Sequence, residues 1–374
     1  MGIHLGQILS MLRDEGPLSR AELARRTMLS ATALTKMTSV MLERGCVVET
    51  KLEPSTQVGR PPTNIEIVFD AFQVIGIHVG AAEVHIALTN LAGKPLHRTS
   101  FRFDSGQTSV TDVIDRIAAK TEELIGLSDV FRSQILGIGV GVPGPVDRAG
   151  RRNILSINAD WTDVPFADEL ERRLNLPVTI EHNVSAMALA EARYGIGRKS
   201  SALLYVYLRS GLGAGLVVDG IPFRPGGHGA VELGHIRVVE QGETCSCGAT
   251  GCLETFLSER ALMQAAGRED GDTSNLLAAV EKNNEAWQTV LHHFTGALSS
   301  AINLLSPDRI VLGGHFAEAP DSFLEHLRST VPGQILPHMR EALCIERSSL
   351  GYGGSAIGGA SVALDQFFYS GAFQ

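Results

Sequence analysis

The sequence predicts a two-lobed α/β body that follows a small N-terminal winged helix-turn-helix domain. The first 68 residues show helical hydrophobic spacing and then short alternating segments. From Gln73 onward, apolar strands alternate with helical stretches, which favours mainly parallel sheets covered by helices. A strand, a glycine-rich turn and a second strand near Ile75 are repeated about 130 residues later, which indicates two related lobes with a cleft between them.

The composition fits a soluble protein with apolar cores. Of its 374 residues, 44% are hydrophobic and 20% are charged, values typical of globular chains. No run of about eighteen apolar residues occurs, which excludes a transmembrane helix and a membrane partner. A basic and then apolar leader is also absent from the first residues, so the expected location is cytoplasmic.

Charge is divided unevenly along the chain, whose formal net charge is −9. Residues 1–68 hold eight basic and seven acidic side chains, a net of +1, while the remainder holds 24 and 34, a net of −10. An acidic surface repels a polyanion. If the chain binds nucleic acid, the N-terminal segment is therefore the part that does so.

Three helices are predicted in that segment. Apolar residues recur at helical spacing over residues 5–12 and mark the first helix. Ser19 and Ser30 are predicted to cap the second and third helices, and Gly45 ends the third. Two helices joined by a short turn are typical of a helix-turn-helix.

The third helix has an apolar stripe and an opposite face of small and polar residues, which suits insertion into the major groove of DNA. Two alternating segments, 46–52 and 65–68, would form the hairpin called the wing. Arg60 lies at its proline-stiffened tip, which suits a narrow A·T-rich minor groove. The alternative is a helical bundle used for protein contacts. The predicted DNA-contacting residues are Ala31, Thr32, Thr35, Lys36 and Arg60.

The body repeats one layout. Residues 74–80 and 84–88 are predicted as a strand and its return, and 202–208 and 214–219 repeat them around a glycine-rich turn. Another apolar strand is predicted at 135–142. Glycine-rich strand ends can cradle phosphate, but they also serve close packing or a tight bend, and the residues alone leave both readings open.

One group of residues has metal-ligand spacing. His235, Cys245, Cys247 and Cys252 are arranged as His-x9-Cys-x-Cys-x4-Cys. Three thiolates and an imidazole supply a closed tetrahedral site, so the predicted ion is a structural Zn²⁺. The loop that carries the cysteines is rich in small polar residues and has little core of its own, so a metal would order it. An iron–sulfur cluster is the alternative, although four cysteines are usual there.

In these features the chain resembles the transcriptional-regulator branch of the ROK family (repressors, open reading frames and sugar kinases). The resemblance spans essentially the whole chain, and the cysteine segment with its upstream histidine is its most specific part. It implies an actin-like, sugar kinase/ribonuclease H-like fold with sugar bound in the cleft. The segments that carry it are Ile75–Gly80, Gly139–Val146, Glu181–Ala186, Glu232–His235, Cys245–Glu254 and Ile310–Gly314.

The resemblance also implies the domain limits and the sugar site. The expected domains are 1–70, a first lobe of 71–183 completed by 355–374, and a second lobe of 184–354. Carboxylates and amides at fixed positions suit vicinal hydroxyls, and His235 would contact sugar with one ring nitrogen and zinc with the other. The implied sugar-binding residues are Asn158, His182, Asn183, Glu232, His235 and Glu254.

Three departures from the kinase members predict that this chain is not an enzyme. Those members place an aspartate, the general base, where this chain has Asn183. An amide cannot accept the proton of a sugar hydroxyl, and loss of such a base commonly costs about 10²–10⁴-fold in rate. The aspartate and threonine of their first glycine turn are replaced here by His78 and Ala82. The prediction is therefore no catalytic residue and a cleft that binds sugar without phosphorylating it.

The sequence thus predicts a transcriptional regulator that responds to a small sugar effector. We expect it to be a repressor of sugar-metabolism genes. A homodimer or homotetramer reading a palindromic operator with A·T-rich flanks is the expected assembly. Two alternatives remain open at this point: an active sugar kinase with an added DNA-binding domain, and a regulator controlled by a protein partner.

Overall fold

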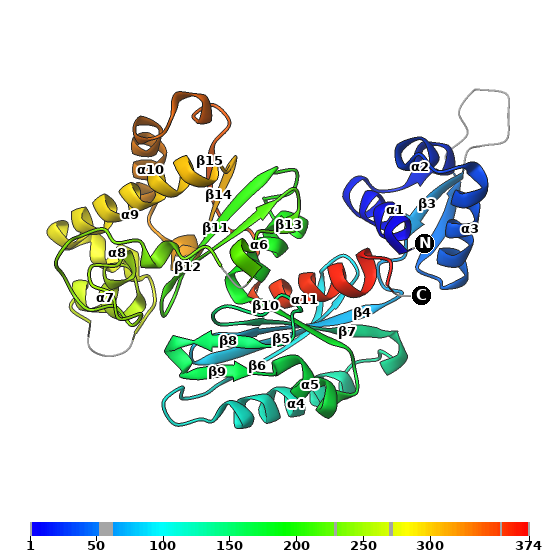
Figure 1. Cartoon of the computed structure of the whole chain (residues 1–374), viewed down its shortest axis with the longest axis horizontal. Helices are drawn as coiled ribbons and strands as arrows, with labels where there is room; N and C mark the ends of the chain where they lie inside the picture. The colour runs from blue at the N-terminus through cyan, green and yellow to red at the C-terminus, as the bar shows by residue number, and fades with distance from the viewer. Residues whose placement is uncertain (1, 52–62, 228–229, 269–271, 352–353, 373–374) are drawn as a thin grey trace.

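The computed structural model describes residues 2–51, 63–227, 230–268, 272–351 and 354–372. Figure 1 shows a small N-terminal domain beside the end of helix α11, next to a body in which two sheets are joined by helices. Within the described residues, no helix is long and apolar enough to cross a membrane.

The N-terminal domain has the predicted helix-turn-helix and hairpin. Its helices are α1 (Gly2–Glu15), α2 (Arg20–Thr27) and α3 (Ala31–Glu43). As predicted, Ser19 Oγ accepts a hydrogen bond from Glu22 N and Ser30 Oγ accepts one from Ala33 N, each at 3.2 Å. A short strand that the sequence did not indicate joins the hairpin, so the sheet order is β1–β3–β2. The strands are β1 (Leu18–Ser19), β2 (Val47–Lys51) and β3 (Thr63–Ile67).

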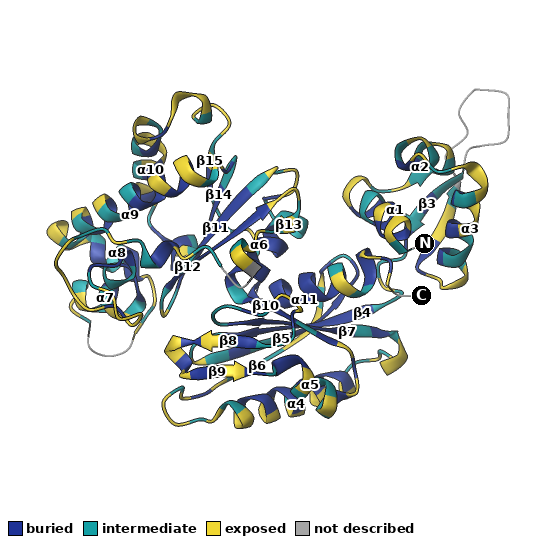
Figure 2. Cartoon of the chain, viewed as in Figure 1, coloured by how far each residue is buried: buried dark blue, intermediate teal, exposed yellow. Residues whose placement is uncertain are grey.

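The first body sheet has the order β10–β7–β4–β5–β6 and packs helices α4 and α5 against one face. Those helices bury one side and expose the other (Figure 2). A small hairpin, β8 (Asn153–Ser156) with β9 (Trp161–Val164), leads from the sheet toward α5. The remaining elements are β4 (Gln73–Val79), β5 (Glu83–Asn90), β6 (Pro95–Arg102), α4 (Val110–Gly126), β7 (Ile135–Val142), α5 (Phe166–Leu174) and β10 (Val178–His182).

The second sheet repeats this plan with the order β13–β12–β11–β14–β15. Its core is built by apolar residues of α8, α9 and α10 packed on β11, β12 and β14. The elements are β11 (Ala202–Leu208), β12 (Leu212–Val218), β13 (Ile221–Pro222), α7 (Glu259–Ala265), α8 (Leu276–Glu281), α9 (Asn284–Leu305), β14 (Arg309–Gly314), α10 (Asp321–Gln334) and β15 (Cys344–Arg347).

The expectation of mainly parallel sheets is wrong. Among the described strands, each body sheet has two parallel and two antiparallel pairs. The connections explain the difference, because only residues 80–82 join β4 to β5 and only residues 209–211 join β11 to β12. A parallel pair needs a crossover of a dozen or more residues, so these short turns impose antiparallel pairing.

Two helices, α6 (Asn183–Tyr194) and α11 (Ser355–Leu364), pack against each other and lie between the sheets (Figure 1). Glycines let α11 approach the first sheet closely. A Cβ added at Gly139 of β7 would lie 2.0 Å from the carbonyl oxygen of Gly359. Val184 and Met187 of α6 share a core cluster with Tyr205 of β11, and α6 also contacts β7 and β10, so it packs against both sheets.

The N-terminal domain shares an apolar core with the body. Leu5, Ile8 and Leu9 of α1 are fully buried in one cluster with Leu364 and Phe368, which belong to α11 and the π-helical turn η9 (Asp365–Tyr369) that extends it. A Cβ at Gly6 would lie 2.4 Å from the carbonyl oxygen of Tyr369, so the two helices touch backbone to backbone. The N-terminal domain is therefore packed on the end of an interlobe helix and not tethered by a loose linker.

Candidate functional site

A cleft of about 400 Å³ lies where the two sheets face each other, and residues of both lobes line it. The first lobe contributes the ends of β4, β7 and β10 and the turn η2 (Ile157–Ala159), and the second lobe contributes the β11–β12 turn and the segment before the cysteines. The structure brings together at this cleft all six residues that the resemblance assigns to sugar: Asn158, His182, Asn183, Glu232, His235 and Glu254.

His182 and Asn183 stand where β10 ends and α6 begins. His182 is buried, its Nδ1 lies 3.2 Å from Ser185 Oγ, and burial lowers its pKa to about 4, so the ring is neutral at pH 7. Asn183 Nδ2 donates to the carbonyl oxygen of Val79 at 3.2 Å, which links the start of α6 to the end of β4. This part of the cleft offers uncharged donors and acceptors.

Glu254 connects the cysteine segment to the second glycine turn. Its Oε2 accepts a hydrogen bond from Leu212 N at 2.9 Å, and its Oε1 accepts one from Ser246 Oγ at 3.4 Å. A Cβ on Gly211 would lie 2.5 Å from Glu254 Oε2, so a larger residue there would displace the Glu254 carboxylate. Glu254 thereby holds the turn and the loop in one arrangement at the cleft wall.

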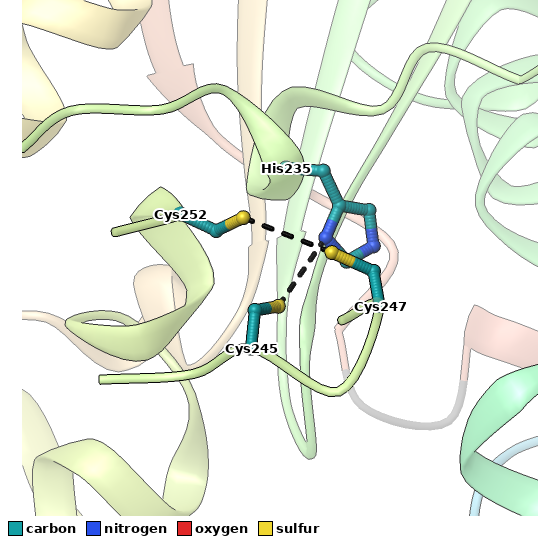
Figure 3. A group of neighbouring side chains, drawn as sticks. All are labelled: His235, Cys245, Cys247 and Cys252. Carbon is teal, nitrogen blue, oxygen red and sulfur yellow. Dashed lines mark hydrogen bonds between the residues drawn. The ribbon is translucent and has the colours of Figure 1, made fainter. Parts of the chain in front are cut away.

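The four predicted metal ligands form one cluster (Figure 3). Their ligand atoms all lie within 4.8 Å of one another, with Cys245 and Cys252 buried and Cys247 exposed. The Sγ atoms of Cys247 and Cys252 are 3.8 Å apart, and Cys245 Sγ is 3.5 Å from His235 Nδ1. The four side chains come from two segments, η4 (Leu233–His235) and residues 245–252.

These distances fit a tetrahedral metal. With metal–sulfur bonds of about 2.3 Å and a metal–nitrogen bond of about 2.0 Å, the edges are about 3.8 Å between sulfurs and about 3.5 Å between sulfur and nitrogen. The observed separations match both edges. His235 also lines the cleft, and Figure 3 shows its second ring nitrogen on the side of the ring away from Cys245 and Cys252. The donor set can therefore hold a metal ion at the cleft wall.

The first glycine turn differs from the second. His78, at the end of β4, is buried and its Nδ1 has no hydrogen-bond partner among the described residues. Burial lowers its pKa to about 3, so the imidazole stays neutral. Ala81 and Ala82 complete the turn and line the cleft without a polar side-chain group. This turn offers no carboxylate at the position of His78.

Three residues at the cleft were missed by the sequence reasoning. Tyr207 and Arg209 flank the end of β11, and Glu259 begins α7. The first two could have been found, because side chains at a strand end beside a glycine turn face the same cleft. Glu259 gave no signal, since its contacts depend on the tertiary fold: its Oε1 lies 2.7 Å from Nε2 of the buried His315.

The predicted DNA-contacting face of α3 is open. Ala31, Thr32, Thr35 and Lys36 are all exposed, opposite the buried Leu34, Met37 and Met41. Thr35 Oγ1 donates to the carbonyl oxygen of Ala31 at 2.8 Å. Arg60 lies outside the described residues, so its contact stays a prediction.

Comparisons with known proteins agree with this architecture. A xylose repressor of Caldicellulosiruptor bescii is 27% identical over 87% of this chain and 86% of its own length. The DNA-binding transcriptional repressor Mlc of Escherichia coli (strain K12) is 25% identical over 96% of this chain and 92% of its own.

Solved structures share the fold. A ROK family transcriptional regulator, a homolog of the E. coli MLC protein, superposes with a TM-score of 0.84 at 24% identity over 99% of this chain and 97% of its own. A ROK family glucokinase from Streptomyces griseus in complex with glucose and AMPPNP has a TM-score of 0.67 at 24% identity, over 79% of this chain and 99% of its own. The predicted two-lobed body with an added N-terminal domain is thus confirmed.

The ROK family model matches residues 74–366. The Mlc repressor matches 96% of this chain, so the similarity to a repressor extends over the N-terminal domain as well as the body. The chain belongs to the ROK family, in the branch whose named members are transcriptional repressors.

Proposed function

We propose that this protein is a cytoplasmic repressor of sugar-metabolism genes whose cleft binds a sugar without phosphorylating it. The proposal rests on two features that occur together in this chain. One is the exposed face of the helix-turn-helix, and the other is a ROK cleft in which an amide, Asn183, stands where the kinase members have their general base. The sugar-binding residues would be Asn158, His182, Asn183, Glu232, His235 and Glu254.

The metal that suits the cysteine cluster is Zn²⁺. His235, Cys245, Cys247 and Cys252 would bind it as four protein ligands, which leaves no open position for catalysis. Zinc would supply the cross-link that orders residues 242–252 and fixes His235 and Glu254 at the cleft wall. Its role in this account is structural.

Helix α6 offers a route from cleft to DNA-binding domain. It begins at Asn183 in the cleft, and near its other end Arg193 Nη2 donates to Asp365 Oδ2 at 2.9 Å. Asp365 Oδ1 lies 3.6 Å from Nη1 of the buried Arg13 on α1, whose guanidinium sits 4.5 Å from the Tyr369 ring centroid. Sugar that closes the cleft would shift α6 and α11, and with them the domain that grips DNA.

We propose three domains. Residues 1–70 form the DNA-binding domain, residues 71–183 with 355–374 form the first lobe, and residues 184–354 form the second lobe. A symmetric dimer or tetramer would place paired α3 helices and the Arg60 tips on a palindromic operator with A·T-rich flanks. Coupling requires a sugar affinity that differs between two states, typically by about 1–3 kcal/mol.

The test measures operator binding and turnover in the same preparation. The operator is selected from fragmented genomic DNA, and its affinity is measured with D-xylose, D-glucose and N-acetylglucosamine. One sugar should shift the operator Kd by at least tenfold, while ADP release stays far below about 1 s⁻¹. Sugar-dependent ADP release at or above that rate would make the chain a kinase.

A single substitution that restores the carboxylate of the kinase members tests whether the chain lacks kinase activity for the reasons given above. Asn183→Asp restores a carboxylate, but His78 and Ala82 remain, so we expect no fast phosphorylation. Robust ADP release by this variant would contradict our account of the first glycine turn.

A further inference from the structure

A buried carboxylate lies next to His182 at the end of the first sheet. Glu181 precedes His182 on β10, and its side chain is only 4% exposed. Glu181 Oε1 accepts a hydrogen bond from the backbone N of His182 at 2.9 Å. Glu181 is not among the described residues that line the cleft. This carboxylate can therefore act on the cleft only through the residues that it holds, and His182 is one of them.

The other oxygen of this carboxylate binds a residue of the second sheet. Glu181 Oε2 accepts a hydrogen bond from Arg224 Nε at 2.8 Å and another from Arg224 Nη2. Arg224 follows strand β13, which pairs with β12, and Figure 1 shows β10 and β13 in different sheets. Among the described residues that line the cleft, Arg224 does not appear either. One ion pair outside the cleft thus joins the first sheet to the second.

Strand β12 connects Arg224 to Glu232, the first of the proposed sugar ligands in the second lobe. Phe223 N donates to a carbonyl oxygen of β12 at 2.8 Å. Val231 forms an antiparallel bridge with the same strand. The residues directly before Arg224 and Glu232 are therefore both fixed on β12, so the position of Arg224 determines that of Glu232.

An ion pair with a buried carboxylate is better suited to fix geometry than to add stability. Removing charges from water offsets much of their attraction, and an apolar pair of similar volume is often as stable. Burial raises the pKa of Glu181, and the Arg224 guanidinium opposes that shift. Two N–H groups of this planar guanidinium converge on one oxygen, which fixes the direction of the contact as well as its length.

We propose that the Glu181–Arg224 pair positions the two walls of the cleft relative to each other, by holding His182 of the first sheet and Glu232 of the second at the separation that fits a sugar. This inference rests on the proposed function, because it takes the cleft as a sugar site. Both members of the pair are positioning residues that do not touch the effector. Glu181 acts through His182, and Arg224 acts through Glu232.

The test compares variants of the full, metal-bound chain by calorimetric titration with D-xylose, D-glucose and N-acetylglucosamine. Arg224→Gln should raise the Kd of the sugar that the unmodified chain binds by at least tenfold, because the two walls are no longer joined. Arg224→Lys keeps the charge but not the planar donors, so it should recover part of that loss. The double variant Glu181→Gln with Arg224→Gln should bind no more weakly than Arg224→Gln alone, since both changes remove the same pair.

Arg309→Gln is the matched control. Arg309 pairs with Glu346 on the neighbouring strand of the second sheet, so this variant breaks a half-buried ion pair that lies within one sheet. It should lower the Tm but leave the sugar Kd within twofold, at a temperature where every variant is folded. A merely structural role of Arg224 would give Arg224→Gln the same result.

A second measurement needs no sugar. Amide-resolved hydrogen exchange should show that Arg224→Gln speeds exchange at least tenfold at both His182 N and Phe223 N, which lie on opposite sides of the pair. Arg309→Gln should leave exchange at both amides unchanged.

The outcomes separate this inference from the proposed function. An Arg224→Gln chain whose sugar Kd stays within twofold, equal losses of affinity in Arg224→Gln and Arg309→Gln, or unchanged exchange at His182 N would each overturn the inference. An unmodified chain that binds none of the three sugars would count against the proposed function. Exchange that rises at both amides would then still support a pair that joins the two walls, and unchanged exchange would overturn both.

Discussion

The two lobes share one sheet topology, but each carries an additional segment that is held in place in a different way. The first lobe carries the N-terminal domain through an apolar core in which Leu5 and Ile8 pack with Leu364 and Phe368. The second lobe carries residues 242–252, whose small polar side chains bury little, and places beside them the His235 and cysteine cluster, whose donor set can hold a metal ion. Apolar packing suffices where large side chains are present, and where they are absent a metal can supply the cross-link.

The difference also assigns roles to the two sides of the cleft. The cysteine loop places His235 and Glu254 at the cleft wall, where we propose that sugar binds, whereas the packed joint holds the domain that carries the exposed face of α3. Helix α6 contacts strands of both sheets, and α11 packs on the first sheet and on α6. Four changes, ordered by expected effect, would break or sharpen this contrast.

Cys252→Ser removes one ligand from the cluster, and chelation removes the metal. We expect the free energy of unfolding to fall by about 4 kcal/mol, since loss of a metal belongs to the most damaging class of changes. Sugar affinity should fall with it. Chemical denaturation and metal analysis measure the effect, with the exposed Cys344→Ser as the matched control. Equal stability of the two variants would show that no metal holds the loop.

Arg13→Ala removes the buried guanidinium at the joint. We expect a loss of about 2 kcal/mol in the free energy of unfolding, because a buried cation-π contact and charged hydrogen bonds vanish together. The operator affinity should also become less responsive to sugar. Arg20→Ala, on the same domain but in a surface ion pair with Glu49, should cost under about 1 kcal/mol. A sugar response unchanged by Arg13→Ala would exclude this route of coupling.

Lys36→Ala tests the exposed face of α3. Operator affinity should drop about tenfold, and the slope of log K against log salt should decrease in magnitude by about 1, because one phosphate contact is lost. Thermal stability should not change, since Lys36 is exposed. Lys120→Ala, on α4 of the body, serves as control, and identical gel shifts for both variants would contradict the winged-helix assignment.

His78→Gln tests the first glycine turn through pH. Burial lowers the folded pKa of His78 to about 3 from about 6.5 when unfolded. Between these values the unfolded chain binds a proton that the folded chain does not, so His78 makes stability decrease as pH falls. The variant should reduce that slope near pH 5 by about 1.4 kcal/mol per pH unit. Parallel curves for both proteins from pH 7 to pH 5 would show that folding does not lower the pKa of His78.

The parts predicted from sequence are those in which local pattern decides. Ser19 and Ser30 cap helices as expected, the stripe of Leu34, Met37 and Met41 is buried, and the ligand spacing gave the metal cluster. The family assignment from the motif segments is confirmed by the family model. These features depend on residues that are close in sequence or carry a specific spacing.

The parts missed depend on contacts between distant segments. The antiparallel strand pairs follow from two three-residue turns, residues 80–82 and 209–211, whereas the alternation of strands and helices along the chain favours parallel pairing. The buried pair of Glu259 and His315 and the contact of Arg13 with Tyr369 join residues far apart in the chain. Hydrophobic periodicity cannot reveal a charged residue that is buried because it pairs with a residue far away in the sequence.

Operator titration with and without saturating sugar, in one preparation with ADP release monitored, tests the central claim most directly. The account predicts that a neutral saccharide shifts the operator Kd by at least tenfold while no phosphate is transferred to it. A saccharide that the chain phosphorylates, or a Kd that no saccharide changes, would contradict it.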